Sequence, residues 1–363
     1  MNAPRMDAWS GTAEAYQDHI LPLVSRTFAL TIPQLPADLR RAVANAYLLC
    51  RTADTIEDEP VFSAEQKRTY EEAFLAVVTG RMPAEALAVE VAPRLSSATL
   101  AAEAELMSRL PLVLEVTRGL RPAQSVAIER CIRLMCRGMH RFQQNAGVQG
   151  LATLRDMDRY CYYVAGVVGE LLTDLFCDHD AAIAARAPQM RRLAVSFGQG
   201  LQMTNILKDQ WEDRARGACW LPREVYERHG ADFDALAPGR CTQQGRDALG
   251  ELIGVAHAHL RNALDYTLLI PPAQTGIRRF CLWAIGLAVL TLRNLHRQPE
   301  FSSGAQIKVS RGAVARTIMV TNLSVRSDAL LRKLFDFAWR DLPLTPLDTS
   351  WDELLRVDRP LVI

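Results

Sequence analysis

The sequence predicts an all-α fold in one domain spanning residues 1–363, with a core over roughly residues 18–340. Hydrophobic residues recur with the helical period along most of the chain, and the strict alternation of a half-buried strand is hard to find. Helix-breaking positions divide the chain into segments of about 15 to 25 residues, the length of long globular helices. No break is long enough for a flexible linker, so we expect one hydrophobic core.

The predicted helix ends follow the breakers in chain order. They fall at Pro60, residues 80–83, Pro122, residues 143–150, Pro188, residues 214–222, residues 271–272, residues 298–304 and residues 341–350. The longest apolar run, FCLWAIGLAVLTL from Phe280, has 13 residues. It is too short to span a bilayer, and it predicts a buried core helix.

The composition excludes several classes of protein. Hydrophobic residues make up 49% of the chain, which is typical of a globular protein. The 42 basic and 41 acidic side chains leave a net charge of +1, so no basic field indicates nucleic acid or anionic lipid. Eight scattered cysteines without a C-x-x-C pair predict reduced thiols and a cytoplasmic protein. The N-terminus has no apolar signal segment.

The first chemical signal is an acidic motif that occurs twice. Residues 54–58 (DTIED) and residues 209–213 (DQWED) share the pattern D-x-x-E-D. Asp54 lies on the helix face that also carries Val43, Tyr47 and Cys50, so it interrupts an apolar stripe. A carboxylate in such a place requires compensation by a cation or a metal.

The second acidic motif lies on a more apolar helix. From Phe197 to Asp213 most sides are apolar or small, and one polar row crosses them: Gln202, Asn205, Asp209 and Asp213. A helix that is apolar nearly all round is normally buried. We therefore expect this polar row to line something internal.

Acids four residues apart on a helix are separated by about 6 Å of rise, so both can reach one hard cation. Mg²⁺ is typically held by one or two carboxylates together with substrate phosphates. Two such helices facing each other would form a cleft for a diphosphate. The glutamates of the motifs, Glu57 and Glu212, lie one step off this face and are expected to support the ligands. Candidate diphosphate-binding cations are Arg26, Arg51, Arg214 and Arg216.

A third stretch combines tyrosines with glycines inside a helix. In residues 158–176 (DRYCYYVAGVVGELLTDLF), Gly166 and Gly169 each cost about 1 kcal/mol relative to alanine. Close helix packing or a kink would offset this cost. Tyr160 and Tyr163 precede the glycines and are equally compatible with core packing and with catalysis. Mg²⁺, a diphosphate and an apolar interior together suggest carbocation chemistry, because an apolar cavity excludes water.

These segments resemble the signature sequences of the squalene and phytoene synthase family. The resemblance runs from about Ser25 past Arg311 and includes SRTFA, RTADTIEDE, YCYYVAGVVG and LQMTNILKDQWEDRARG followed by WLP. YCYYVAG, the pair Phe280-Cys281 and IKVSRG (307–312) are more similar to squalene synthase than to phytoene synthase.

The resemblance implies an all-α isoprenoid-synthase fold with a central cavity surrounded by helices. It implies coupling of two farnesyl diphosphates to presqualene diphosphate with Mg²⁺, followed by reduction to squalene with NADPH. By position, the implied Mg²⁺ ligands are Asp54, Asp58, Asp209, Asp213 and Asn205, and the proton-transfer residue is Tyr160. The implied diphosphate contacts are Ser25, Arg26, Arg51, Gln202, Asn205, Arg214 and Arg216, and the NADPH contacts are Arg51, Lys308 and Arg311. The apolar pocket would be lined by Phe28, Val164, Gly166, Val167, Leu171, Phe280 and Cys281.

Four departures from the family pattern stand out. Lys208 replaces the usual arginine before Asp209, which keeps the charge but loses the bidentate fork. Met203 stands where squalene synthases often have lysine, and Leu-Trp-Ala-Ile follows Phe280-Cys281 where they usually have Ala-Ile-Pro-Gln. We expect the chain to lack the C-terminal membrane anchor of the eukaryotic enzymes. The first three changes bear on the reduction and leave the coupling intact.

Several alternatives remain open from the sequence. The same chemistry could end at presqualene diphosphate, hydroxysqualene or dehydrosqualene, or could form phytoene from geranylgeranyl diphosphate. A non-catalytic scaffold protein and a helical prenyl-lipid-binding module are the other classes, but neither has a use for four aspartates. The working expectation is a cytoplasmic monomer with peripheral contact to the inner membrane for product release and no nucleic-acid partner.

Overall fold

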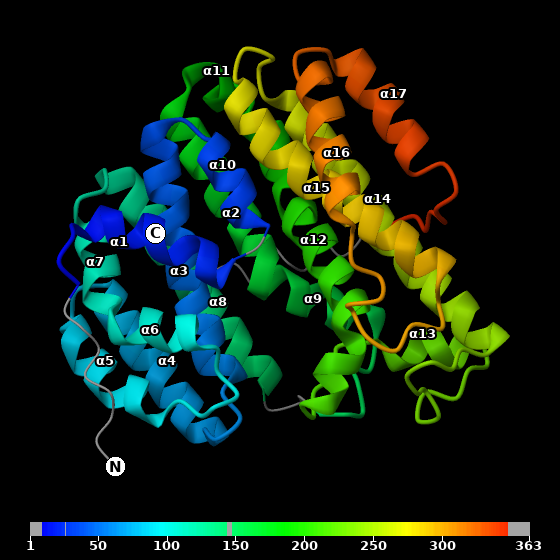
Figure 1. Cartoon of the computed structure of the whole chain (residues 1–363), viewed down its shortest axis with the longest axis horizontal. Coiled ribbons are helices and arrows are strands. Elements are labelled where there is room, and N and C mark those ends of the chain that lie inside the picture. The colour runs from blue at the N-terminus through cyan, green and yellow to red at the C-terminus, as the bar shows by residue number, and fades with distance from the viewer. Residues whose placement is uncertain (1–8, 26, 144–146, 348–363) are drawn as a thin grey trace. The chain divides into compact units, whose positions relative to one another are not determined.

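A computed structural model shows a chain built from helices (Figure 1) and describes residues 9–25, 27–143 and 147–347. Over these ranges there is no β-strand, which confirms the all-α prediction. The helices are α1 (Ala13–Val24), α2 (Phe28–Thr31), α3 (Ala37–Asp58), α4 (Ala64–Val78), α5 (Ala84–Val91), α6 (Ala101–Ser108), α7 (Leu110–Arg118), α8 (Pro122–Gln143), α9 (Leu154–Cys161), α10 (Val167–His179), α11 (Ala181–Ala184), α12 (Ala187–Ala215), α13 (Arg223–Arg228), α14 (Gln243–Leu269), α15 (Thr275–Arg297), α16 (Arg311–Ser324) and α17 (Asp328–Ala338). Two 3₁₀ turns (Ile32–Gln34 and Ala92–Arg94) and a π-helical turn (Tyr162–Gly166) complete the described secondary structure.

Several helices begin or end where the breakers predict, but residues 84–121, which carry no predicted break, are divided into the short helices α5, α6 and α7. α3 ends two residues before Pro60, α8 begins at Pro122, and α12 carries Pro188 in its first turn. Proline is tolerated there because the first N–H groups of a helix have no partner within it. α4 begins with a capping box in which Ser63 and Gln66 satisfy each other's backbone N–H groups.

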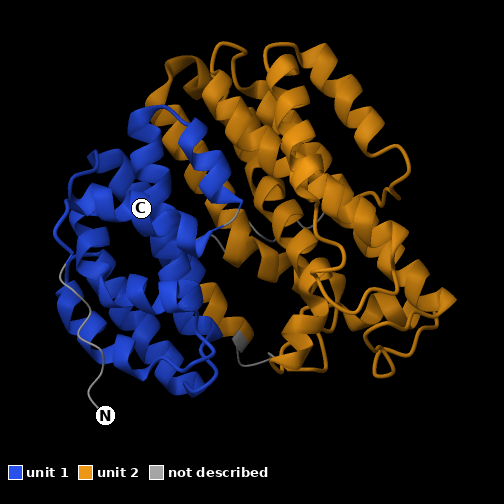
Figure 2. Cartoon of the chain, viewed as in Figure 1, with its two compact units in different colours: residues 1–136 blue, residues 137–363 orange. Residues whose placement is uncertain are grey.

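The chain divides into two compact units, residues 1–136 and residues 137–363 (Figure 2). The division falls within α8. The expectation of a single domain over residues 1–363 stays a prediction, and each unit is described by itself.

In unit 1, α3 packs against α1, α4, α6 and α7. A buried polar contact fixes α3 to α7, because Asn45 Nδ2 donates to the Val113 carbonyl at 2.8 Å and the Thr117 hydroxyl donates to Asn45 Oδ1 at 2.8 Å. Leu39, Leu48, Leu49 and Ile56 are among the fully buried residues of the same helix. The acidic motif therefore ends a helix that is held rigidly.

In unit 2, the long helices α12 and α14 form the centre and pack against each other. Glycines allow α12 to approach the preceding segment closely. A Cβ atom on Gly169 would lie 1.9 Å from the Ala194 carbonyl oxygen, and one on Gly198 would lie 2.0 Å from that of Ala165. The predicted explanation for glycine inside this helix, close packing, is thus confirmed at Gly169.

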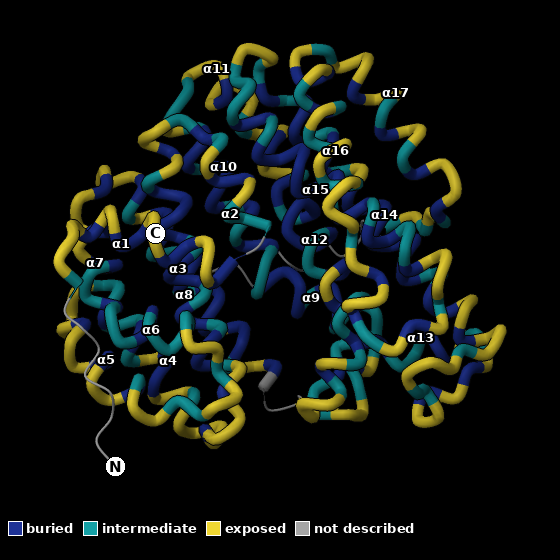
Figure 3. Tube along the Cα trace, in the orientation of Figure 1, coloured by how far each residue is buried: buried dark blue, intermediate teal, exposed yellow. Residues whose placement is uncertain are grey.

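α15 contains the longest apolar run and is mostly buried (Figure 3). Among the described residues it is long and apolar enough to cross a membrane, but 72% of its apolar window lies inside the protein. This burial agrees with the prediction of a core helix. Near its N-terminus the fully buried Arg278 donates to the Ile270 and Val325 carbonyls and pairs with Asp328 at 2.7 Å, so it ties α15 to the ends of α14 and α16 and to α17.

Candidate functional site in the two acidic helices

The first acidic motif forms the last turn of α3 and holds an excess of negative charge. Burial raises the pKa of Asp54 from its ordinary value of 3.8 to about 7, with Arg51 opposing the shift and Asp58 and Glu103 adding to it. Arg51 lies 3.8 Å from Asp54 and 3.7 Å from Glu103. The Asp54 side chain keeps 30% of its surface exposed. A cation from solvent can therefore reach a carboxyl group that otherwise retains a proton near neutral pH.

Glu57 and Asp58 differ in their surroundings. Asp58 is exposed. Burial, with repulsion from Asp58, Asp54 and Glu71, raises the pKa of Glu57 well above its usual range, and its Oε1 atom has no hydrogen-bond partner among the described residues. Glu57 is thus a second carboxyl group with a raised pKa beside the predicted ligands. The sequence spacing had placed it one step off their face.

The other predicted site residues of unit 1 lie between α1 and α3. The Ser25 hydroxyl accepts a hydrogen bond at 3.0 Å from the N–H of Phe28, the first residue of α2. The Phe28 ring lies 5.3 Å from that of Tyr47, one helical turn before Arg51. Arg26 lies outside the described residues.

The second acidic motif, on α12, is neutralised by its own neighbours. Lys208 Nζ lies 2.5 Å from each carboxylate oxygen of Asp209. Arg216 donates to Asp213 at 2.6 Å. Asp213 is buried, whereas Asp209 keeps 37% of its side chain exposed.

The polar row on α12 is more exposed than the sequence predicts. Asn205 is exposed and Gln202 is half-buried, although both were expected to line an internal space. Arg214 donates to the carbonyls of Leu236 and Phe233 at 3.2 and 3.4 Å, and its guanidinium lies 4.8 Å from the Phe233 ring centre. In this conformation Arg214 fixes the segment after α13.

The segment after α15 covers part of the second motif, a contact that sequence reasoning missed. The Gly304 N–H donates to Glu212 Oε1 at 2.8 Å, and Trp211 Nε1 donates to the Phe301 carbonyl at 2.8 Å. A Cβ atom on Gly304 would lie 2.8 Å from Asp209 Oδ1. Glu212 therefore positions this segment, which leads on to the exposed residues Lys308 and Arg311.

Tyr160 lies in the last turn of α9 with its ring held between aromatic side chains. Its ring stacks on that of Trp220 with centroids 4.0 Å apart and an angle of 6° between the planes. The edge of Phe142 meets it at 5.5 Å. Sequence analysis missed Trp220 as a site residue, although it precedes the Leu-Pro of the matched signature.

A buried polar network holds the turn that precedes Tyr160. Asp158 accepts a hydrogen bond from Gln199 Nε2 at 2.8 Å, and His259 Nε2 lies 3.4 Å from the same carboxylate. The other ring nitrogen of His259 lies 3.1 Å from the Ser196 hydroxyl, which also accepts from Asn262. α9, α12 and α14 are thereby joined two residues before Tyr160. Directly after Tyr160 and Cys161 the π-helical turn supplies the predicted irregularity.

The predicted apolar-pocket residues of unit 2 are mostly part of its core. Gly166, Val167, Leu171, Phe280 and Cys281 are buried, and Val164 is half-buried. Phe280 meets the edge of Phe176 at 6.3 Å. Trp283 and Ile285, which lie in the segment departing from the squalene synthase pattern, are buried in α15.

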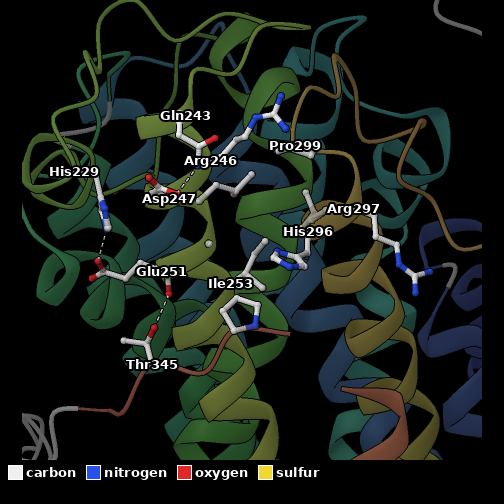
Figure 4. A pocket seen from close by; sticks show the side chains of 14 residues that line it. His229, Gln243, Arg246, Asp247, Glu251, Ile253, His296, Arg297, Pro299 and Thr345 are labelled. Carbon is white, nitrogen blue, oxygen red and sulfur yellow. Dashed lines mark hydrogen bonds and ion pairs between the residues drawn. The ribbon is translucent and has the colours of Figure 1, made fainter. Parts of the chain in front are cut away.

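Unit 2 also has a cavity of about 680 Å³ between α14, the end of α15 and the segment around Pro343 (Figure 4). Some of its polar side chains contact one another: His229 and Glu251 lie 2.8 Å apart, and Gln243 donates to Asp247 at 2.9 Å. None of the described site residues predicted from sequence lines it. This cavity is therefore distinct from the acidic motifs.

Comparison with known proteins yields matches over most of the chain. The family model described as squalene/phytoene synthase matches residues 21–313. The squalene synthase of Candida albicans is 29% identical over 83% of this chain, and that of Botryococcus braunii is 30% identical over 88%. The matched regions span 65% and 66% of those proteins, slightly less than two thirds of their length.

Solved structures share the fold. TcSQS bound to a ligand superimposes with a TM-score of 0.70 at 24% identity, covering 95% of this chain and 96% of that one. A dehydrosqualene synthase gives 0.65 at 22% identity, with 87% of this chain and 97% of that one covered. The squalene synthase HpnC from Alicyclobacillus acidocaldarius gives 0.55 at 20% identity, with coverages of 80% and 95%.

Proposed function

Because the chain belongs to the squalene/phytoene synthase family, we propose that it is a prenyltransferase that couples two farnesyl diphosphates head to head into presqualene diphosphate and reduces this to squalene. The observation that carries the proposal is the pair of D-x-x-E-D motifs, each at the C-terminal end of a well-packed helix. The whole reaction, its substrates and its cofactors are part of the proposal.

The chemistry of the first motif fits a divalent cation. Asp54 holds a proton near neutral pH because burial and neighbouring acids disfavour its charge, and a hard cation would relieve the same repulsion. Asp54 and Asp58 would hold Mg²⁺ on α3, and Asp209 and Asp213, with Asn205, on α12. An Mg²⁺ ion held there would supply positive charge that offsets the charge of the diphosphate as it leaves. Arg51 and Arg216, already beside these acids, would hold the released diphosphate.

Tyr160 is proposed to carry the proton that leaves when the cyclopropane closes. Trp220 and Phe142 fix its ring, and the Asp158 network fixes its backbone. The buried apolar residues around the π-helical turn would keep water from the cation. Lys308 and Arg311 are exposed cations and fit the phosphate of NADPH, which would supply the hydride for the reductive half.

One observation favours a second possible product, formed without the reduction to squalene. The replaced segment after Cys281 is buried in α15, and Trp283 Nε1 has no hydrogen-bond partner among the described residues. If this segment alters the reductive half, the enzyme would stop at presqualene diphosphate, hydroxysqualene or dehydrosqualene. Geranylgeranyl diphosphate in place of farnesyl diphosphate would give phytoene.

Product analysis tests the proposal. Purified protein is incubated with farnesyl diphosphate and Mg²⁺, with and without NADPH, and the extract is treated with phosphatase and analysed by gas chromatography–mass spectrometry. Squalene that appears only with NADPH supports the full reaction. A coupled product that is the same with and without NADPH supports the second endpoint. No coupled product from farnesyl diphosphate or geranylgeranyl diphosphate contradicts the proposal.

A tyrosine pair tests the proton-transfer role. Tyr160→Phe should lower the rate of presqualene diphosphate formation by about 10²- to 10⁴-fold, because it removes the acid–base group. Tyr163→Phe, in the adjacent turn, is the matched control and should stay within a few-fold of the wild type. An unchanged rate in Tyr160→Phe removes the residue from the mechanism.

A further inference from the structure

α16 and α17 carry apolar side chains that the fold leaves exposed. α16 contains Val314, Ile318, Met319, Val320 and Leu323, yet its buried residues are Thr321 and Ser324. Met319 is 56% and Leu323 79% exposed. On α17, Leu330 is 52% and Phe337 64% exposed. The neighbouring α15, which is similarly apolar, is buried in the core, so the exposure belongs to this hairpin (Figure 3).

Cations flank these apolar side chains at helical spacing. On α16, Arg316 precedes Met319 by three residues and Arg326 follows Leu323 by three, just beyond the helix end. On α17, Lys333 lies between Leu330 and Phe337, and the Arg340 guanidinium lies 5.4 Å from the Phe337 ring centre. Residues three and four apart share a helix face. We call these eight residues the α16–α17 surface: Arg316, Met319, Leu323, Arg326, Leu330, Lys333, Phe337 and Arg340.

The charge around this surface is positive although the whole chain is nearly neutral. Residues 308–341 contain seven basic and three acidic side chains, against 42 and 41 in the whole sequence. One of the acids, Asp328, is paired with the buried Arg278 at 2.7 Å. Asp265 of α14 pairs with Arg332 at 2.8 Å. The remaining exposed acids here are Asp336 and Asp341, so the surface keeps an excess of cations.

We propose that the α16–α17 surface docks onto a bilayer that contains anionic lipid. Apolar side chains flanked by lysine and arginine suit a membrane interface, where the apolar groups enter the acyl boundary and the cations remain among the headgroups. Two copies of this surface would bring like charges together, which disfavours self-association. The inference does not depend on the proposed reaction, although a hydrocarbon product would leave most easily into a bilayer.

Vesicle co-sedimentation tests the proposal with the full chain. Wild-type protein should sediment with vesicles of phosphatidylcholine and phosphatidylglycerol and much less with phosphatidylcholine alone. Raising the salt to about 1 M shortens the Debye length to about 3 Å and should release the protein. The double variant Leu323→Gln/Phe337→Gln should lower the partition coefficient by about tenfold, because it removes the apolar insertion.

Matched variants separate the surface from general effects. Val89→Gln/Val126→Gln changes two side chains of unit 1 that are 76% and 67% exposed, and it should bind as the wild type does. Lys333→Glu should weaken binding to the anionic vesicles several-fold, whereas Arg118→Glu, at an exposed position of α7, should not. Far-ultraviolet circular dichroism confirms that each variant is folded.

Several outcomes overturn the proposal. The proposal is wrong if the wild-type protein stays in the supernatant with anionic vesicles. It is also wrong if Leu323→Gln/Phe337→Gln binds these vesicles as well as the wild type does, or if Val89→Gln/Val126→Gln loses as much binding as Leu323→Gln/Phe337→Gln does. Sedimentation velocity tests whether a second copy of the chain, instead of a bilayer, covers the α16–α17 surface. A wild-type dimer that becomes a monomer in Leu323→Gln/Phe337→Gln, without vesicle binding, assigns the surface to a second copy of the chain.

Discussion

The two D-x-x-E-D motifs share a sequence pattern but differ in their electrostatics. At the first motif, Asp54 and Glu57 have raised pKa values because burial and neighbouring acids outweigh the opposing charges of Arg51 and Lys67. At the second motif, Asp209 is bound to Lys208 and Asp213 to Arg216. The carboxylate charge of the same sequence pattern is therefore offset by protonation at the first motif and by ion pairs with lysine and arginine at the second. If both bind Mg²⁺, the ion displaces a proton at the first motif and competes with basic side chains at the second.

The largest expected effect is on activity, where the two motifs should behave alike. Asp54→Asn and Asp209→Asn should each lower diphosphate release from farnesyl diphosphate by about 10³-fold or more, because each removes a charge from a proposed metal site. Release is measured by a coupled diphosphate assay at saturating Mg²⁺. Near-normal turnover in either variant would remove that motif from the metal assignment.

Stability should separate the motifs. Between pH 4 and pH 7 the folded state keeps a proton on Asp54 that the unfolded chain releases, since the pKa rises from 3.8 to about 7 on folding. Stability contributed by this group therefore falls as the pH rises through this window and is constant above it. Without Mg²⁺ at pH 8, Asp54→Asn should raise the free energy of unfolding by about 1–2 kcal/mol.

Asp209→Asn is the matched comparison for this stability effect. Lys208, the partner of Asp209, is partly exposed, so loss of this ion pair should lower the free energy of unfolding by about 0–1 kcal/mol. Urea unfolding in EDTA at pH 5 and pH 8 measures both variants. An Asp54→Asn variant no more stable than the wild type at pH 8 would contradict the electrostatic difference between the motifs.

The cations beside the motifs should shift the Mg²⁺ requirement in opposite directions. Lys208→Met frees the Asp209 carboxylate and should lower the half-saturating Mg²⁺ concentration about three- to tenfold. Arg51→Met removes the cation that lowers the pKa of Asp54. Protons should then compete more strongly with Mg²⁺ for this carboxylate, and the variant should need more Mg²⁺ at pH 7 than at pH 9. Titration of diphosphate release with Mg²⁺ at both pH values measures the shifts. If the half-saturating Mg²⁺ concentration shifted equally and in the same direction in both variants, the proposed electrostatic difference between the motifs would be wrong.

The smallest expected effect concerns the contact between Gly304 and the second motif. Gly304→Ala places a methyl group 2.8 Å from Asp209 Oδ1 and should lower kcat/KM several-fold by displacing the carboxylate or the segment. Gly312→Ala is the matched control, because a methyl group there meets nothing within 4 Å. Steady-state kinetics on both variants measure the effect, and a Gly304→Ala enzyme as active as the control would show that the contact is unimportant.

Local features of the sequence account for much of the fold and for the outline of the site. Helical periodicity and prolines predict the helices because both act within a few residues. The unusual position of Asp54 could be predicted from its place on an apolar stripe. The stacking of Trp220 on Tyr160 could not, because residues on separate segments are brought together only by the tertiary fold. The approach of Gly304 to Asp209 and the network from Asp158 to His259 are of the same kind.

Averages over the chain also conceal local features. A net charge of +1 gave no indication of anionic lipid, yet the basic side chains gather around the α16–α17 surface. The exposure of Met319 and Leu323 on α16 depends on packing, which the sequence pattern does not reveal. A local pattern can also mislead. The helix pattern predicted that Asn205 lines an internal space, but the side chain is exposed in the structure.

Direct binding of Mg²⁺ and inorganic diphosphate tests the central claim that both motifs form metal–diphosphate sites. Isothermal titration calorimetry of the wild type, Asp54→Asn and Asp209→Asn with diphosphate, in the presence and absence of MgCl₂, requires no turnover. We expect Mg²⁺-dependent binding in the wild type, weakened at least tenfold in both variants, and proton release on binding at pH 6.5 that is smaller in Asp54→Asn than in the wild type. Binding that is independent of Mg²⁺, or unchanged in both variants, would contradict the central claim.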